Sequence, residues 1–103
     1  MLAYLRIRKL SIDVIPGGMP FVSLSIQKIY YDEEQDKEIQ VIGNFDRIIK
    51  KFSDIGTMPI GNIADDGYID PYELYDIVAN AAYPWVIEEH GGQMIDGKLV
   101  VDE

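Results

Sequence analysis

Polar and apolar residues alternate along two stretches of the chain, residues 3–15 and 21–31. Because successive side chains of a strand point to opposite faces, this alternation predicts two β-strands. The segment between them, residues 16–20, holds two prolines and two glycines, which is typical of a turn. The two strands are therefore expected to form an antiparallel hairpin.

The alternation shifts by one residue in both stretches, at Lys9 and at Gln27, which face each other if the turn is centred on Gly18. Such a shift moves the apolar side chains to the opposite face of the hairpin. One interpretation is a projecting arm, residues 8–28, whose outer half contacts a partner. The alternative is a β-bulge in each strand, which restores one common apolar face and makes the hairpin part of the core. The expected contact residues lie in the outer half and at the turn: Leu10, Ile12, Val14, Met19, Val22, Leu24 and Ile26.

The middle of the chain predicts a short strand and a helix. After an acidic turn, a third strand is expected at residues 39–42. Residues 44–55 then place apolar side chains at the spacing of one helix face. Asn44 is a suitable N-cap and Gly56 a suitable stop for this helix.

A second helix and a small hairpin are predicted near the C-terminus. Asp70 and Pro71 have the character of a helix start, with a capping side chain followed by proline at the first helical position. Pro84 is expected to end this helix near Ala82 or to kink it. The Asp96-Gly97 pair predicts a tight hairpin turn.

Together these elements predict an α+β fold in a single domain, residues 1–103. It consists of a long N-terminal antiparallel hairpin with a short third strand, two amphipathic helices packed on its base, and a small C-terminal hairpin.

Charge is distributed unevenly. Residues 1–31 carry four Lys or Arg against one Asp, a net charge of +3, whereas residues 32–103 carry five Lys or Arg against seventeen Asp or Glu, a net charge of −12. Opposite charges on two parts of one surface favour head-to-tail association, because complementary potentials steer the encounter. The same distribution also fits a basic strand face that only offsets the acidic remainder of its own chain.

The 103 residues contain no cysteine and no apolar run of the length that a membrane helix needs. A disulfide framework and a thiolate metal site are thereby excluded. We expect a soluble chain without a signal peptide, located in the cytoplasm or in a particle assembled there, with no membrane partner.

Residues 62–73 resemble, mainly in their second half, the twelve-residue calcium loop of EF-hand proteins. The resemblance implies a Ca²⁺ site with Asp66, Asp70 and Glu73 as ligands, because a hard cation prefers carboxylate oxygens. The segment departs from the family pattern at Ala64, which has no ligand atom. A turn followed by a helix start explains the same residues without a metal.

No group of residues predicts catalysis or nucleic-acid binding. His90, the only histidine, has neither a nucleophile nor an orienting partner at recognisable spacing, and is expected to be a cation near a helix C-terminus. The serines at 11, 23 and 25 alternate with apolar residues and are expected to line a polar face. The aromatic residues lack the basic groove that a nucleic-acid platform needs. We therefore expect a protein that is not an enzyme and that has no cofactor.

These observations favour a structural or interaction subunit of a larger protein assembly, which contacts protein partners or further copies of itself through the N-terminal hairpin. A repeating particle such as a bacteriophage virion or tail is the setting to test first. One alternative is an acidic inhibitor that mimics nucleic acid, whose binding would vanish with added salt. The other is a small calcium-binding module with a degenerate EF-hand-like loop.

Overall fold

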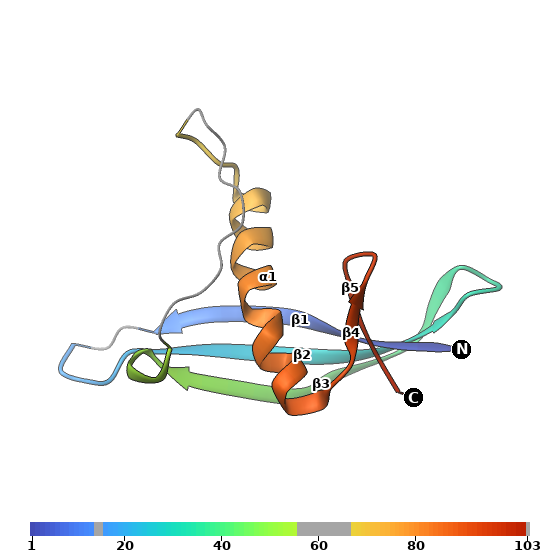
Figure 1. Cartoon of the computed structure of the whole chain (residues 1–103), viewed down its shortest axis with the longest axis horizontal. Helices are drawn as coiled ribbons and strands as arrows, with labels where there is room; N and C mark the ends of the chain where they lie inside the picture. The colour runs from blue at the N-terminus through green and yellow to red at the C-terminus, as the bar shows by residue number, and fades with distance from the viewer. Residues whose placement is uncertain (14–15, 56–66, 103) are drawn as a thin grey trace.

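A computed structural model describes residues 1–13, 16–55 and 67–102 of the chain. In these residues five antiparallel strands form one sheet, in the order β3-β2-β1-β5-β4, and one α-helix lies against it (Figure 1). The elements are β1 (Leu2–Asp13), β2 (Phe21–Asp32), β3 (Lys37–Lys51), the 3-10 helix η1 (Phe52–Asp54), α1 (Pro71–His90), β4 (Gln93–Ile95) and β5 (Lys98–Val101).

The predicted fold class is wrong, because the described chain is mostly antiparallel sheet with one α-helix in place of two. Residues 44–55, predicted as the first helix, form the second half of β3 and η1. Pairing with β2 continues from Asp32↔Lys37 to Phe21↔Lys51, and these ladder hydrogen bonds outweigh the helical spacing of the sequence. Ile48 is 7% exposed and Ile49 is 53% exposed, which is the alternation of a strand.

Both predicted hairpins are confirmed. β1 pairs with β2, and β4 pairs with β5 across a turn in which Asp96 and Gly97 have φ angles of 50° and 78°. Positive φ at both central residues is the requirement of a type I′ turn, which the Asp-Gly pair satisfies.

The start of α1 is also confirmed. The Asp70 side chain accepts a hydrogen bond from the backbone N–H of Glu73 at 2.9 Å, with Pro71 in the first turn. The helix does not end near Ala82 but continues through Pro84 to His90. Pro84 and Asn80 are both exposed, so water can satisfy the carbonyl whose helical partner the proline removes.

A β-bulge in β1 explains the phase shift near Lys9. The register moves by one residue between Ile7↔Ile26 and Lys9↔Ser25, so that Arg8 is an extra residue in β1. Because of this bulge, Ile7 and Leu10 both pack toward the same core. The predicted arm, whose outer half contacts a partner, is therefore contradicted. Of the alternative, a bulge in each strand, the pairing of β1 with β2 contains only the bulge in β1.

The register and the second irregularity differ from the prediction. Lys9 faces Ser25 and not Gln27, because the turn is not centred on Gly18. The irregularity at Gln27 lies between β2 and β3, where the register shifts between Ile26 and Lys28. The extra residues of this irregularity lie in β3, because one residue of β2 faces three of β3. β2 itself pairs regularly with β1 from Leu2↔Tyr31 to Ile7↔Ile26, so its apolar side chains change face, and Ile29 lies beside Tyr4 on the face opposite Ile26.

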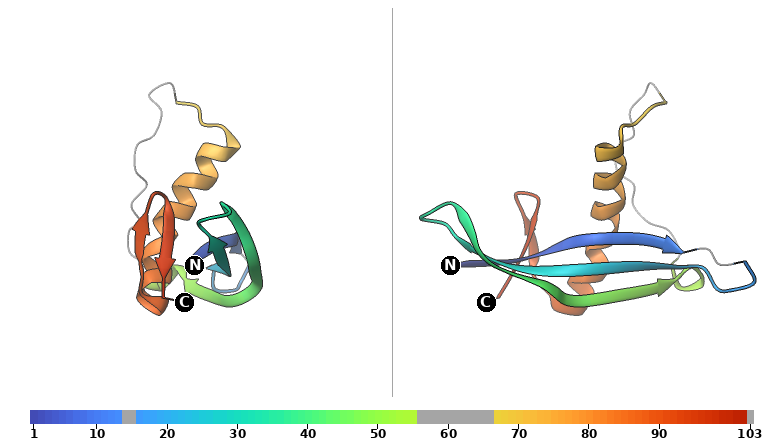
Figure 2. Two further views of the ribbon diagram at one scale, coloured as in Figure 1. Left: turned by 90° about the vertical axis from the view of Figure 1, so that its right-hand side faces the viewer. Right: turned by 180° about the vertical axis from the view of Figure 1, so that it is seen from behind.

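The helix crosses the strands at a steep angle and packs on the sheet through its C-terminal half (Figures 1 and 2). Small side chains, Ala79 near the middle of the helix and Ala81 and Ala82 in this half, are buried and allow a close approach. The N-terminal half of α1 extends past β1, and residues 71–76 are all exposed. The core between α1 and the sheet consists of Leu5, Ile7, Val22, Leu24, Ile26, Ile48, Ala82, Val86 and Leu99.

A second, smaller cluster covers the opposite face of the sheet near the N-terminus. Tyr4 is buried there, and its hydroxyl donates a hydrogen bond to Glu38 Oε1 at 2.9 Å. The Arg6 guanidinium contacts the same oxygen at 2.8 Å. Lys98 Nζ lies over the rings of Tyr4 and Tyr31, at 5.2 and 5.0 Å from their centroids. These contacts connect the residues next to the β2–β3 turn with β1 and β5.

The Glu38 contacts predict a loss of stability in acid. The hydrogen bond from Tyr4 and the adjacent Arg6 lower the pKa of Glu38. The ionised Glu38 therefore stabilises the folded chain at neutral pH, and this stabilisation is lost as pH falls below about 4.3. Glu38→Gln should therefore reduce the free energy of unfolding at pH 7, by up to about 1 kcal/mol because the site is partly exposed. Urea unfolding at pH 7 and pH 3 tests this, since the difference between variant and wild type should shrink in acid; an equal difference at both pH values would contradict it.

Candidate functional site

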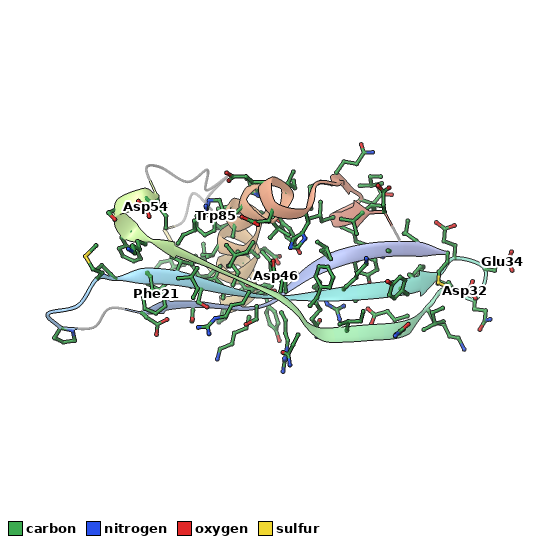
Figure 3. The ribbon with its side chains drawn as sticks, turned by 90° about the horizontal axis from the view of Figure 1, so that it is seen from below. Phe21, Asp32, Glu34, Asp46, Asp54 and Trp85 are labelled. Atoms are coloured by element: carbon green, nitrogen blue, oxygen red, sulfur yellow. The ribbon has the colours of Figure 1, made fainter. Side chains whose placement is uncertain are left out.

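Exposed apolar side chains lie on both faces of the sheet at the end that holds the β1–β2 turn, which we call the distal end. Ile12 shares the α1 face with its partner Val22, and Ile49 shares the opposite face with its partner Ser23. The backbone N–H of Phe52 donates to the Pro20 carbonyl at 3.0 Å and ties η1 to the turn. Figure 3 shows Phe21 and Asp54 at this end of the sheet. The distal end is defined by Ile12, Met19, Ile49 and Phe52, whose exposed fractions are 57%, 59%, 53% and 41%.

The structure divides the contact residues predicted from the sequence. Ile12 and Met19 are exposed and belong to the distal end. Leu10 is half-buried against the core, and Val14 lies outside the described residues. The remaining three, Val22, Leu24 and Ile26, are buried beneath α1 and cannot contact a partner while the chain is folded.

β3 forms one edge of the sheet. It is 15 residues long and pairs only with β2 among the described strands. A strand at a sheet edge presents unpaired N–H and C=O groups on its outer side, which can pair with a strand of another chain. Ile39, Val41 and Ile42 are exposed along this strand, in addition to Ile49. The edge is therefore long, and its exposed apolar side chains lie between charged residues at both ends of the strand.

The exposed half of α1 is held to the sheet at the bulge. The Tyr75 hydroxyl donates to the Ile7 carbonyl at 2.8 Å, beside the interruption of the β1–β2 ladder. Tyr83 lies two turns further along, and its burial raises the pKa of its phenol. Tyr72 and Leu74 remain exposed on the same half.

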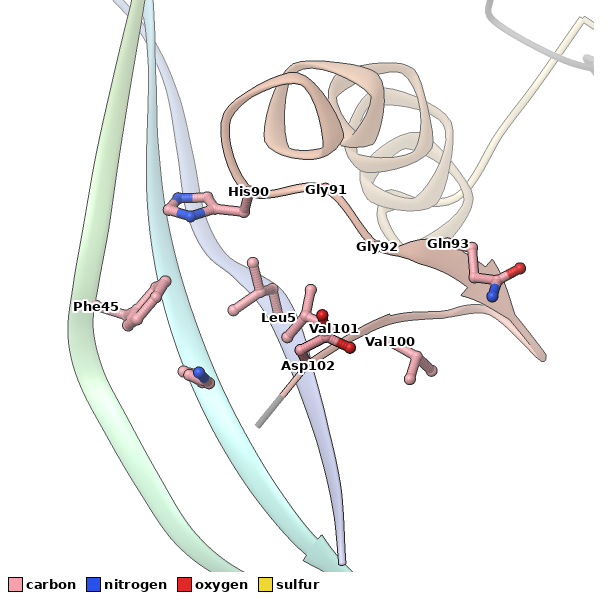
Figure 4. Close-up of a pocket in the computed structure, with 10 residues that line it drawn as sticks. Leu5, Phe45, His90, Gly91, Gly92, Gln93, Val100, Val101 and Asp102 are labelled. Atoms are coloured by element: carbon pink, nitrogen blue, oxygen red, sulfur yellow. The ribbon is translucent and has the colours of Figure 1, made fainter.

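A pocket of about 370 Å³ opens between the C-terminal end of α1 and the sheet (Figure 4). Gly92 has a φ of +92°, and a side chain there would lie 2.5 Å from the Val100 carbonyl, so the close approach of the helix end to β5 requires glycine. The lining residues are Leu5, Lys28, Phe45, His90, Gly91, Gly92, Gln93, Val100, Val101 and Asp102.

His90 lies at the end of α1, as predicted, but it has an orienting partner that the sequence spacing did not indicate. Its Nε2 is 2.6 Å from Asp46 Oδ2, and its ring packs against Phe45 with 5.2 Å between centroids. The pocket lining contains an imidazole, an ammonium and a carboxylate but no hydroxyl or thiol nucleophile. The His90–Asp46 contact thus joins the end of α1 to β3, and the absence of catalysis stays a prediction.

The proposed calcium ligands are not gathered into a site in the described residues. Asp66 lies outside them, and the Asp70 carboxylate is engaged as the N-cap of α1. The nearby Asp70 charge raises the pKa of Glu73, as expected for two neighbouring carboxylates. No group of three or more His, Asp or Glu positioned to hold a metal is found in residues 1–13, 16–55 and 67–102. Calcium binding stays a prediction, which calorimetric titration can test.

Sequence analysis missed Ile49 and Phe52 as surface residues because it placed both on the buried stripe of a predicted helix. A signal for their exposure is present in the sequence, since Ile48 and Ile49 are adjacent and Lys50 and Lys51 follow. In a strand, two adjacent apolar residues face opposite sides, and one of them is exposed if only one side is covered.

Comparisons with protein-family models, with curated proteins and with solved structures found no match to this chain. The one described α-helix is not apolar enough along its length to cross a lipid bilayer.

Proposed function

We propose that this protein is a non-enzymatic interaction subunit that assembles with further copies of itself through the distal end and the outer edge of β3. The observation that carries the proposal is the combination of a 15-residue edge strand with exposed apolar side chains along it and at its end. An uncovered edge strand with exposed apolar side chains can pair with a strand of another chain. Soluble assemblies are most often built from copies of one chain, which supports a second copy as the partner.

The free energies of burial and of association indicate that self-association needs both the distal end and the outer edge of β3. Burying four side chains of the distal end would contribute roughly 6 to 12 kcal/mol, at about 1.5 to 3 kcal/mol each. Association costs about 4 to 15 kcal/mol in lost freedom of motion, so this contribution is of the same size as the cost. Strand pairing along β3 and burial of its exposed apolar side chains would supply the surplus.

A charge at the distal end tests this proposal. Ile49→Asp should weaken self-association at least about tenfold, because it places a carboxylate in an apolar contact. The unfolding free energy of the single chain should change by no more than about 1 kcal/mol, since Ile49 is half exposed at a sheet edge. Light scattering measures the self-association, and urea unfolding measures the stability of the folded chain.

Gln35→Glu is the matched control for charge. It adds the same negative charge in the exposed turn between β2 and β3, at the opposite end of the sheet. It should leave association unchanged. Equal weakening by both variants would show a general effect of charge, and association of Ile49→Asp at the wild-type level would contradict the proposal.

The setting that we propose for such a subunit is a repeating particle, such as a bacteriophage virion or tail. A long, thin molecule with extents of 49 × 34 × 19 Å and two sheet edges can contact more than one neighbour. This geometry supports repeated head-to-tail or edge-to-edge contacts, which such particles use.

A further inference from the structure

The face of the sheet opposite α1 holds a polar hollow of about 290 Å³. Its side chains come from three adjacent strands and from two neighbouring rows of the ladder. Lys9, Ser25 and Arg47 form one row, because Lys9 pairs with Ser25 and Ser25 pairs with Arg47. Ser11 and Ser23 form the next row. These five residues, Lys9, Ser11, Ser23, Ser25 and Arg47, line the hollow.

Contacts within the hollow orient its cations. Ser23 is only 5% exposed, and its Oγ accepts a hydrogen bond from Arg47 Nε at 3.0 Å. This bond fixes the plane of the guanidinium and leaves its two terminal nitrogens available. Guanidinium groups bind oxoanions through such parallel N–H donors.

Neither cation of the hollow is neutralised by a carboxylate. In the part of the chain that the structure describes, neither Lys9 nor Arg47 forms an ion pair, whereas the neighbouring Arg6 is paired with Glu38. Asp13 does not line the hollow but accepts a hydrogen bond from the hydroxyl of the lining residue Ser11 at 3.2 Å. Two unpaired cations beside three hydroxyl groups are notable in a chain with a net charge of −9.

We propose that this hollow binds a tetrahedral oxoanion, either free phosphate or the phosphoryl group of a larger molecule. Lys9 would supply a mobile positive charge, Arg47 a fixed pair of donors, and Ser25 a hydroxyl donor, whereas the Ser11 hydroxyl donates to Asp13. The hollow is too small and has too few cations to follow a nucleic-acid backbone, which needs a continuous basic groove. The hollow lies beside the distal end, because Ile49 pairs with Ser23 and continues the row of Ser11 and Ser23. The proposal needs no second copy of the chain, since all five residues that line the hollow belong to one molecule.

Titration with inorganic phosphate tests the proposal. At constant ionic strength set with chloride, phosphate should shift the backbone amide NMR signals of Lys9, Ser23, Ser25 and Arg47 in a saturable manner. At a phosphate concentration about five times the dissociation constant, the midpoint of thermal unfolding should rise by about 4 to 8 °C. A phosphomonoester titrated in the same way identifies the source of the anion: tighter binding than phosphate indicates a phosphorylated molecule, and equal or weaker binding indicates the free ion.

Two variants and a control keep the result specific. Arg47→Gln should weaken phosphate binding about tenfold, and Ser25→Ala should weaken it by a smaller factor, because a charge-assisted hydrogen bond is stronger than a neutral one. Lys37→Gln removes an equal charge from the exposed β2–β3 turn region and should leave binding unchanged. No saturable shift, wild-type affinity in Arg47→Gln, or equal weakening in Lys37→Gln would overturn the proposal.

Discussion

Deletion of Arg6 is expected to prevent stable folding. Between Leu5 and Leu10, the shortened strand would place Ile7 on the solvent side and Arg8 beneath α1, because side chains of a strand alternate between faces. Loss of a buried Ile7 costs about 2 to 5 kcal/mol, and burial of an unpaired guanidinium costs several more. Their sum is comparable to the total stability of a domain, about 5 to 15 kcal/mol. Circular dichroism and urea unfolding measure the result.

Deletion of Arg8 is the matched control, because it removes the same charge from the same strand. Arg8 is the extra residue of the bulge, so its removal leaves a regular ladder in which Ile7 still faces Ile26 and Lys9 still faces Ser25. This variant should fold. Arg6→Ala, which loses only the contacts of the side chain, should cost no more than about 1 kcal/mol. If both deletion variants fold, or if neither folds, the bulge does not determine which side chains of β1 face the core.

The second large effect is expected at Leu24. This side chain is fully buried beneath α1, so Leu24→Ala should reduce the free energy of unfolding by about 2 to 5 kcal/mol through lost burial and the cavity left behind. Ile12→Ala, in the paired strand but at an exposed position, should change it by no more than about 0.5 kcal/mol. Equal costs in urea unfolding would contradict the division of the hairpin into core and contact residues.

Local signals in the sequence predicted the elements that depend on a few neighbouring residues. The Asp70 cap with Pro71, and the Asp96-Gly97 turn, each satisfy a backbone requirement within three or four residues, and the structure contains both. The N-terminal hairpin was predicted for the same reason, from its alternation and the turn at residues 16–20.

The rest depends on pairing between distant residues, which the sequence does not show directly. Residues 44–55 fit one face of a helix as well as a strand, and the choice is made by the partner strand β2. The position of the bulge was visible as a phase shift at Lys9, but the alternation cannot distinguish a bulge from a change of face. Similarly, Asp46 and His90 are 44 positions apart, and only the fold brings them together.

Only part of the candidate site could be predicted, because burial also depends on contacts between distant residues. Ile12 and Met19 lie at the end of the hairpin beyond the cover of α1, and their exposure follows from the strand length and the turn. Val22, Leu24 and Ile26 have the same character in the sequence, and the position of α1 alone determines that they are buried. Ile49 and Phe52 could enter the site only once β3 was known to be a strand.

Sedimentation velocity of the wild-type chain over a wide range of concentration tests self-association most directly. Between about 5 and 500 μM, a range that spans moderate to weak dissociation constants, the mean sedimentation coefficient should rise as contacts at the distal end and β3 form. In Ile49→Asp the rise should move to higher concentration. A wild-type chain that sediments as a single monomeric species across the whole range would contradict the proposed function.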